Sequence, residues 1–499
     1  MSNTARALII AFSVGMILIS FAIGWWAKRK ANTAKAYFGS TGMFGPLVVG
    51  LSSTAAVASA FALVGIPGIL YATGNAMTFW MLSSAAFAMA YIIIGKKVRA
   101  MAEIGEVASL GDVSDLRFNN NKIIKGSMSI TLLLGCIAYL SAQIKAGSEL
   151  FSHLVGWSPL VSGLVIFGVL TIYMSVSGEV GGLLTQAFQG FVMVLAGLVL
   201  VVAFFRMTGG GFGEVLKVTS EAGTVTANNV TKEFSPGILD AWGTLPKVAA
   251  MAYMLIPILG TVGQPQVLTR MYALKDPKDM PRLGLYSAIA HTIVGLLTLV
   301  VASGALYLVG TGKIAPLDNP DRAIYEFADY SGLIVQLFVY AAVLAAAMSS
   351  ASLFLSISSN IIIRDLPDAF GIKLSEEKQM KYAKGAMAVI GVASIFFSIT
   401  QGEMVAILGT FGWGTLMSAT FPVFILGLLW KKASVKGVMA GSVMALILNI
   451  VSFLNLIPWP GALPWYFNVI TISIITTVVV SLLAKDEVLD KKVEAVIEL

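Results

Sequence analysis

Long apolar runs that alternate with short polar gaps occupy this sequence from residue 7 to residue 484. A helix needs about 20 apolar residues to cross the hydrocarbon of a bilayer, and about thirteen runs approach that length. They cover 7–27, 44–73, 77–95, 126–152, 158–177, 183–206, 243–269, 283–309, 332–363, 383–400, 403–430, 437–456 and 465–484. The gaps are too short for a separate soluble core. The sequence therefore predicts a single all-α, polytopic membrane domain over residues 1–499.

Composition and single residues argue against several other classes of protein. Only 12% of the residues are charged, whereas a soluble protein has about 25% charged residues. The one cysteine, Cys136, cannot form an intramolecular disulfide, and the two histidines are too few for a histidine-based metal cluster. The sequence contains no phosphate-binding loop of the GxxxxGKS or GxxxxGKT kind. We therefore expect no nucleotide-driven pump, no catalytic residues and no organic cofactor.

Basic residues are divided unevenly between alternate gaps. The gap after the first run and every second gap from there hold 25 Lys and Arg residues, and the N-terminus with the remaining gaps holds 6. Basic loops face the cytoplasm. The sequence thus predicts a multi-pass protein of the cytoplasmic (inner) membrane with its N-terminus outside and its C-terminus in the cytoplasm. The net charge of +7 then reflects loops that face anionic lipid, and we expect the bilayer as partner, no nucleic acid and no obligatory protein partner.

Helix-breaking residues interrupt two of the runs. The second run contains Gly45-Pro46 and Gly65-Ile66-Pro67-Gly68, and the seventh contains Pro257 and Gly263-Gln264-Pro265. Such residues free backbone groups that need a partner inside the protein or a water-filled cavity. Glycine and proline are common in membrane helices, so one such run alone would indicate little. The two runs lie five apart and cross in opposite directions, and matched interruptions in inverted halves indicate a transporter binding site.

Three serines lie close together in the ninth run, which reads Ala345-Ala346-Ala347-Met348-Ser349-Ser350-Ala351-Ser352. On a helix, Ser349 and Ser352 share one face and Ser350 is displaced by one step. Hydroxyl oxygens are hard donors of the kind that alkali cations prefer. Serines also let membrane helices pack closely, and composition alone slightly favours that second interpretation.

At these residues the chain resembles the sodium/solute symporter family, and most nearly its sodium/proline symporter branch. The matching pieces are Tyr37-Phe38-Gly39, Gly45-Pro46, Gly65-Ile66-Pro67-Gly68, Asp112-Val113 with Arg117-Phe118, Tyr139 through Gly147, Gly263-Gln264-Pro265 with Arg270, and Met348-Ser349-Ser350. The resemblance implies a LeuT-type core of two inverted five-helix repeats, with broken helices in the second and seventh runs. The repeats would cover about 44–206 and 243–430, and the helices at 7–27, 437–456 and 465–484 would be additional.

The resemblance also implies a sodium site. Its ligands would be the backbone carbonyls of Ala55, Ala58 and Ala346 and the hydroxyls of Ser349 and Ser350. Two residues depart from the family's pattern. Val57 stands where proline-transporting relatives have an aspartate, which weakens the expectation that proline is the solute. Gln186 stands where many relatives have an aspartate linked to cation handling, which argues against a further sodium site there.

By the same resemblance, side chains from four runs would line a solute pocket. They are Ser53, Ser59 and Phe61 of the second run, Tyr139 and Gln143 of the fourth, Gln264 of the seventh and Trp413 of the eleventh. Aromatic rings cover an apolar body while amide and hydroxyl groups orient polar ends, which suits a small metabolite. For each aromatic residue, ordinary helix packing remains an equally good interpretation.

Lys145 lies outside the family's pattern, within the apolar run 126–152. A charge at the centre of a membrane helix costs roughly 2.5–3.5 kcal/mol on insertion. The side chain could reach the external membrane surface, pair with Glu149 one turn further along the helix, or meet a substrate carboxylate or a proton in the cavity. His291 is a second candidate for a proton-carrying role.

These features predict a secondary transporter that couples entry of a small organic solute, such as an amino acid or a carboxylate, to a cation that is expected to be sodium. One alternative keeps the fold but replaces sodium with a proton or with uncoupled transport, using Lys145 or His291. A less favoured alternative is a solute sensor with a transporter fold. A membrane enzyme is disfavoured because the runs contain no paired carboxylates, histidine cluster or Ser/His/Asp set.

Overall fold

Helices make up most of the described chain, because a chain inside a bilayer must pair its backbone N–H and C=O groups within its own helices. The computed structural model describes residues 3–27, 39–75, 86–234, 236–401, 404–461, 463–484 and 489–499. The helices of the first half are α1 (Asn3–Ala27), α3 (Pro46–Val57), η2 (Phe61–Gly65), α4 (Ile66–Thr73), α6 (Ala86–Ala90), η5 (Tyr91–Gly95), α7 (Lys96–Ile104), α8 (Leu110–Arg117), α9 (Lys122–Val155), α10 (Pro159–Thr208), α11 (Gly211–Glu221) and α12 (Pro236–Leu239).

The second half is also helical. It contains α13 (Lys247–Gly260), η6 (Thr261–Gly263), α14 (Pro265–Ala273), η7 (Pro277–Asp279), α15 (Met280–Gly310), η8 (Pro320–Arg322), α16 (Ala323–Ser331), α17 (Leu333–Asn360), η9 (Ile361–Asp365), α18 (Leu366–Ala369), α19 (Glu376–Gln401), α20 (Val405–Thr420), η10 (Phe421–Leu426), α21 (Gly427–Leu429), α22 (Val435–Phe453), α23 (Trp465–Leu483) and α24 (Lys491–Glu498). A short antiparallel hairpin, β1 (Thr224–Ala227) and β2 (Val230–Glu233), precedes α12. Its turn is Asn228-Asn229, both at positive φ, as tight hairpin turns require.

Ten helices of the described ranges are long and apolar enough to cross a bilayer, or eleven if the bent pair α3 and η2–α4 forms one span. A helical, multi-pass membrane protein is therefore confirmed. The predicted run 77–95 lies partly in residues 76–85, outside the described ranges. The predicted runs 158–177 and 183–206 follow one another in α10 across a kink at Gly178 (φ 57°, ψ −161°). The number thirteen and the division into inverted repeats remain predictions.

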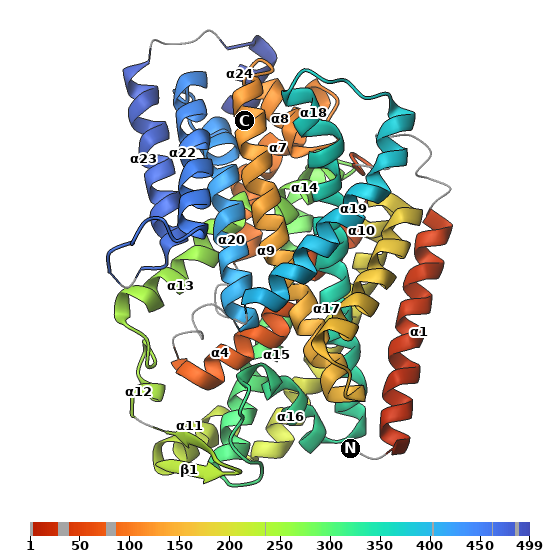
Figure 1. Cartoon of the computed structure of the whole chain (residues 1–499), viewed down its shortest axis with the longest axis vertical. Coiled ribbons are helices and arrows are strands. Elements are labelled where there is room, and N and C mark those ends of the chain that lie inside the picture. The colour runs from red at the N-terminus through yellow and green to blue at the C-terminus, as the bar shows by residue number, and fades with distance from the viewer. Residues whose placement is uncertain are drawn as a thin grey trace.

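The central helices position the candidate site. α9 packs against α20 and α17, and α10 packs against α17 and α3. In Figure 1, α1 lies at one edge of this group and α22 and α23 lie at the other. The N-terminal end of the chain lies near α16, whereas the C-terminus lies at the opposite end of the molecule, near α7 and α8 (Figure 1).

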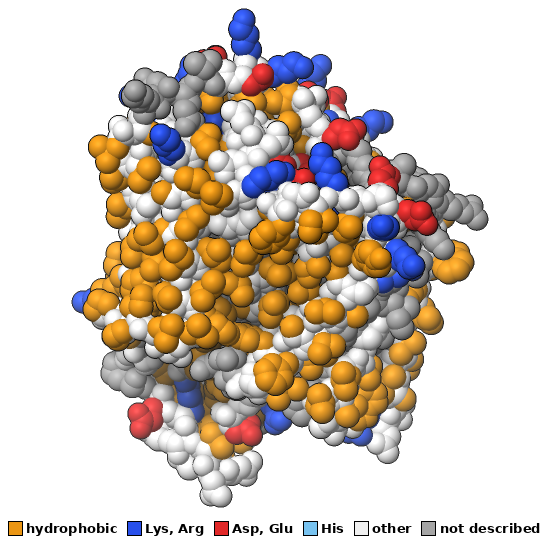
Figure 2. All heavy atoms as spheres, turned by 45° about the horizontal axis from the view of Figure 1, so that its top comes forward, with side chains coloured by type: hydrophobic (Ala, Val, Ile, Leu, Met, Phe, Trp, Pro, Cys, Tyr) orange, Lys and Arg blue, Asp and Glu red, His pale blue; other side chains and the backbone are white. Residues whose placement is uncertain are grey.

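The surface of the molecule is divided into an apolar and a charged part. Figure 2 shows hydrophobic side chains over a broad area of the middle, whereas the blue and red side chains gather mainly at the end that holds the C-terminus. Large apolar side chains such as Leu18, Ile92, Val389, Phe396 and Leu482 are exposed. Apolar areas of this size are rare on soluble monomers, so this surface is suited to contact with lipid.

Candidate ion- and solute-binding site

The helix pair α3 and α4 is interrupted in the middle of the protein. α3 ends at Val57, Ala58 leaves helical geometry (φ −75°, ψ 61°), and the chain turns by 53° before it continues through η2 into α4. A second interruption separates η6 from α14 at Gln264, which is extended (φ −70°, ψ 129°). At both places backbone groups lose their partners in the helix and become available to side chains or ligands.

Two serines of α17 contact the carbonyls at the end of α3. The Ser349 hydroxyl donates to the Ala55 carbonyl (2.7 Å) and to the Ala346 carbonyl of its own helix (3.0 Å). The Ser350 hydroxyl donates to the Ala56 carbonyl (3.0 Å). Both serines are fully buried. Four of the five predicted sodium ligands thus lie together on two facing helices.

The fifth predicted ligand, Ala58, lies beyond the last turn of α3. Its N–H donates to the Thr54 carbonyl (2.7 Å), and the residue lines the solute cavity described below. The carbonyl of Ala56 is the one that Ser350 reaches instead. The assignment of all five residues as sodium ligands remains a prediction.

Gln186 of α10 connects the serine helix to a buried ion pair. Its side-chain oxygen accepts from the Ser52 hydroxyl (3.0 Å) and from the Arg270 guanidinium, and its nitrogen donates to the Ser352 hydroxyl (3.0 Å). Arg270 also pairs with Glu179 (2.6 Å), and both residues are buried. Unlike a carboxylate, the neutral amide of Gln186 brings no negative charge to offset the guanidinium, so this position disfavours a cation. Sequence reasoning missed this ion pair because Glu179 lies in the gap between the runs 158–177 and 183–206, where a charged residue is not unusual.

A small cavity lies beside the α3 interruption. It has a volume of about 30 Å³, and its walls include Ala58, Phe61, Phe87, His291 and Trp413. Sequence reasoning placed Phe61 and Trp413 in the solute pocket but missed Phe87, because one more aromatic ring in an apolar run carries no distinguishing signal. Pockets for small molecules usually measure about 300–1,000 Å³. The cavity must therefore enlarge before it can hold a solute.

Polar side chains stabilise the interruption next to this cavity. The hydroxyls of Ser59 and Tyr139 are hydrogen-bonded (2.8 Å), and the Gln143 side chain accepts from the N–H of Ala60 (3.0 Å). Tyr139 also lies 4.7 Å from the ring of Phe354 and 6.3 Å from that of Trp413. The structure thus brings Ser59, Tyr139 and Gln143 together.

Two other predicted pocket residues face different partners. Ser53 forms a hydrogen bond with the Tyr91 hydroxyl. Gln264 donates to the Trp413 carbonyl (3.0 Å) and accepts from the Gln266 side chain (3.2 Å). Gln264 therefore connects the second interruption to α20, the helix that carries Trp413.

His291 of α15 faces the cavity from the opposite side. Its ring stacks on that of Phe87, with centroids 4.3 Å apart, and Nδ1 lies 2.9 Å from the Ser287 carbonyl and 3.2 Å from the Thr54 hydroxyl. The Ser287 carbonyl can only accept, so Nδ1 carries a proton. Nε2 is buried and has no hydrogen-bond partner among the described residues.

Four charged residues lie together near the end of α9 that is close to α16. Glu149 lies 3.9 Å from Arg322 of η8, and its pairing with Lys145 remains a prediction. Lys145 is close enough to Asp321 to attract it electrostatically. The Asp321 carboxylate accepts from the N–H of Val405, the first residue of α20 (3.1 Å). Asp321 therefore connects η8 to α20 at one end of the bundle.

Gly68 of α4 permits this arrangement, because a Cβ there would lie 3.0 Å from Asp321 Oδ1. Burial raises the pKa of Asp321 from 3.8 to about 6, although the hydrogen bond from Val405 and the charge of Lys145 oppose that shift. The charge of Glu149 adds to it. The carboxylate is consequently a proton acceptor in the weakly acidic range.

Comparisons with known proteins agree on the class of this chain. A model of the sodium:solute symporter family matches residues 37–445. The chain is 26% identical over 448 residues to the osmoregulated proline transporter of Bacillus subtilis (strain 168), covering 87% of each protein. It is 24% identical over 451 residues to the sodium/pantothenate symporter of Escherichia coli (strain K12), covering 87% of this chain and 88% of that protein. These relatives are transporters and not enzymes.

A solved structure has a similar fold. It is that of a Na+-coupled sialic acid symporter in a substrate-bound, outward-open state, and it matches with a TM-score of 0.75 at 18% identity. The match covers 97% of this chain and 99% of that one.

We predict that Asp321→Asn makes the stability of the protein less dependent on pH between 8 and 5. The raised pKa means that the folded protein binds the proton more tightly than the unfolded chain. The stabilisation that comes from protonating Asp321 is complete below pH 3.8 and is lost as the pH rises through about 6. At pH 5 it amounts to about 1–2 kcal/mol. The measurement is the thermal unfolding midpoint in detergent across this pH range; parallel curves for wild type and variant would contradict it.

Proposed function

Since the chain belongs to the sodium:solute symporter family, we propose that it couples sodium entry to the uptake of a small organic solute, such as an amino acid or a carboxylate, across the cytoplasmic membrane. One observation carries this proposal. The hydroxyls of Ser349 and Ser350 face the carbonyls of Ala55 and Ala56 where α3 is interrupted. These oxygens are of the type that replaces the hydration shell of an alkali cation.

Sodium would bind between α3 and α17 by taking the place of the hydroxyl protons. The two serine hydroxyls would rotate so that their lone pairs face the ion, and the carbonyls that now accept from them would become ligands. Burial of both serines excludes water, so each oxygen matters more than it would at the surface. The ion would thereby hold α3 against α17.

Coupling follows from the position of this site next to the solute cavity. Ala55 and Ala56 form the end of α3, and Ala58 and Phe61 line the cavity only a few residues later. An ion that orders the end of α3 also orders that wall of the cavity. Each ligand then strengthens the binding of the other by the same factor.

The solute would be held by two kinds of wall. Phe61, Phe87 and Trp413 supply aromatic surface for an apolar body. Ser59, Tyr139 and Gln143 supply polar groups at the interruption, where one end of the solute can be oriented. Relatives are named for proline and pantothenate, so both compounds belong in the first set of candidate solutes.

A proton is the alternative coupling ion, and His291 is the residue that favours it. Its ring lines the cavity, and its buried Nε2 has no hydrogen-bond partner within the described ranges. A proton at Nε2 would place a positive charge beside the solute. Uptake that follows a pH gradient and ignores sodium would favour this alternative.

We also propose that the end holding α7, α8 and the C-terminus is cytoplasmic. The basis is the distribution of 25 basic residues against 6 in the sequence. Lys122, Lys125, Arg364 and Lys431 form ion pairs at this end of the molecule.

We predict that Ser349→Ala and Ser350→Ala each raise the sodium concentration for half-maximal uptake by about tenfold. Each change removes one oxygen ligand, a loss comparable to about 1–2 kcal/mol, while a small side chain preserves helix packing. Uptake of labelled proline and pantothenate into proteoliposomes is measured as a function of sodium. The uptake rate at saturating sodium should recover.

Ser394→Ala is the matched control, because this buried serine of α19 donates to the Ile390 carbonyl of its own helix. It should leave the sodium response unchanged. A wild-type sodium response in both Ser349→Ala and Ser350→Ala would mean that these serines serve only packing. Sodium-independent uptake by the wild type would contradict sodium coupling.

We predict that Ser59→Ala and Tyr139→Phe weaken solute binding by about threefold to tenfold and leave the amount of folded protein unchanged. Each variant deletes one hydroxyl of the pair that lies at the interruption, at a typical loss of about 1 kcal/mol. The solute is first identified by sodium-dependent uptake into proteoliposomes. The measurement is then the solute concentration that gives half-maximal uptake in each variant. Reduced amounts of folded protein with normal affinity would assign both hydroxyls to packing instead.

We predict that a cysteine at Lys373 is labelled from the cytoplasmic side only. The test uses a Cys136→Ser background and a thiol reagent that cannot cross the membrane. Lys373 lies in the exposed segment between α18 and α19, so access does not depend on unfolding. Labelling should require permeabilised cells, and labelling of intact cells would reverse the proposed orientation.

A further inference from the structure

A second cavity, lined by both polar and apolar side chains, lies two helical turns from the serine site. It is enclosed by α8, α10, α14, α17 and η9, and its volume is about 20 Å³. A cavity of about 10–15 Å³ is enough for one water-sized species. Its polar lining consists of Ser109, Glu179, Thr269, Tyr272, Ser356, Asn360 and Asp365.

Glu179 Oε2 and Thr269 Oγ1 are buried polar atoms of this lining that have no hydrogen-bond partner in the described part of the chain. The two residues are only 5% and 6% exposed. The other oxygen of Glu179 is paired with Arg270. A buried carboxylate oxygen that lacks a donor is unfavourable, and both atoms belong to residues that form the cavity wall.

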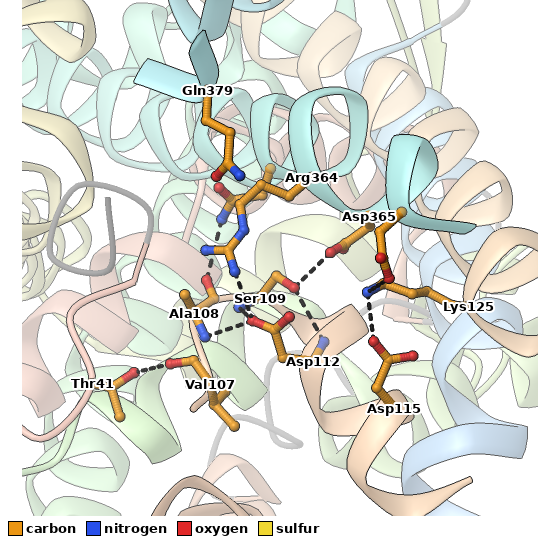
Figure 3. Close-up of polar contacts among 12 residues, drawn as sticks. Thr41, Val107, Ala108, Ser109, Asp112, Asp115, Lys125, Arg364, Asp365 and Gln379 are labelled. Atoms are coloured by element: carbon orange, nitrogen blue, oxygen red, sulfur yellow. Dashed lines mark hydrogen bonds and ion pairs between the residues drawn. The ribbon is translucent and has the colours of Figure 1, made fainter. Parts of the chain in front are cut away.

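Asp365 provides the second carboxylate of the cavity. It is 1% exposed and accepts from the Ser109 hydroxyl at the start of α8 (2.7 Å). Figure 3 shows Ser109 between Asp365 and Asp112. Gly111 makes room for this carboxylate, because a Cβ at that position would lie 2.6 Å from Asp365 Oδ1.

The basic side chains near Asp365 attract its carboxylate electrostatically, but their ion pairs are formed with other carboxylates. Lys125 binds Asp115 (2.6 Å) and Asp368 (2.8 Å), and Arg364 lies 3.4 Å from Asp112. Figure 3 shows Lys125 and Arg364 on either side of this group. The cavity therefore lies between two carboxylates that can share one added positive charge.

We propose that this cavity is a second binding site for a monovalent cation, Na+, held by the Glu179 and Asp365 carboxylates with the hydroxyls of Thr269 and Ser356. These four side chains offer oxygen atoms of the hard type favoured by alkali cations. Arg270 offsets part of the negative charge of the two carboxylates. The remaining negative charge suits a monovalent cation rather than a divalent one. The enclosed volume admits an ion that has lost its water.

The position of this cavity suggests what the second site does. Ser356 follows Ser349 by seven residues on α17, and Glu179 precedes Gln186 by seven residues on α10. Seven residues of helix correspond to roughly 10 Å. The cavity lies between the serine site and the charged group of Figure 3. The ion released from Ser349 and Ser350 would bind here next, so this role, unlike the site itself, rests on the proposed function.

The test is direct binding of radioactive Na+ to the purified full-length protein without solute. The wild type should bind two Na+ per chain. Thr269→Val removes one unpartnered hydroxyl at nearly constant volume, and Asp365→Asn removes one charge while keeping an acceptor for Ser109. Each should weaken one Na+ site by about tenfold or more and leave the other unchanged. Thr219→Val is the matched control, because that buried hydroxyl of α11 donates to the Val215 carbonyl.

Ser349→Ala separates the two sites. It should weaken Na+ binding at the serine site and leave unchanged the site that Thr269→Val affects. A wild type that binds one Na+, lost in Ser349→Ala and retained in Thr269→Val, would overturn the second site and leave the proposed function intact. Two Na+ sites that are both indifferent to Ser349→Ala would instead contradict the coupling site of the proposed function.

Discussion

The contact between the serines of α17 and the carbonyls that end α3 is the interaction on which the rest of the arrangement depends. A membrane helix can be interrupted only where its freed backbone groups find partners inside the protein. Here Ser349 and Ser350 satisfy the carbonyls of Ala55 and Ala56, and Gln143 satisfies the N–H of Ala60. The interruption is thus held from two sides by helices α17 and α9.

A second constraint is the cost of charge within the bundle. Arg270, Glu179 and Gln186 form a buried group in which the guanidinium has partners on α10. Removing one member of a buried ion pair leaves the other charge unpaired, which is strongly destabilising. Arg270 therefore fixes α14, which follows the second interruption, against α10. The two interruptions are consequently anchored to the same helix, since α10 also packs against α3.

The sequence predicted the polytopic helical class and the family because both depend on local patterns: apolar runs of membrane length and short motifs such as Met348-Ser349-Ser350. It also brought Ala55, Ala346, Ser349 and Ser350 into one proposed site. It missed the Glu179–Arg270 pair, which joins residues 91 positions apart, and it did not anticipate that Glu149 lies near Arg322. Such contacts depend on how distant helices are rotated, and no local pattern records that rotation. Ser53 shows the same limit, since its hydroxyl is hydrogen-bonded to Tyr91, 38 residues further along the chain.

The two cavities differ in a way that separates their roles. The one beside Phe61 and Trp413 is walled mainly by rings and must grow to admit a solute, which requires the aromatic contacts with Tyr139 to loosen. The one beside Glu179 and Asp365 is already of the size of a single ion, and its carboxylates are fixed by Arg270 and Ser109. A rigid, charged cavity suits an ion whose coordination distances are short, whereas an aromatic cavity that opens suits a larger organic molecule. Gln186 of α10, which is hydrogen-bonded to Ser52 of α3 and Ser352 of α17, links the helices that carry the two sites.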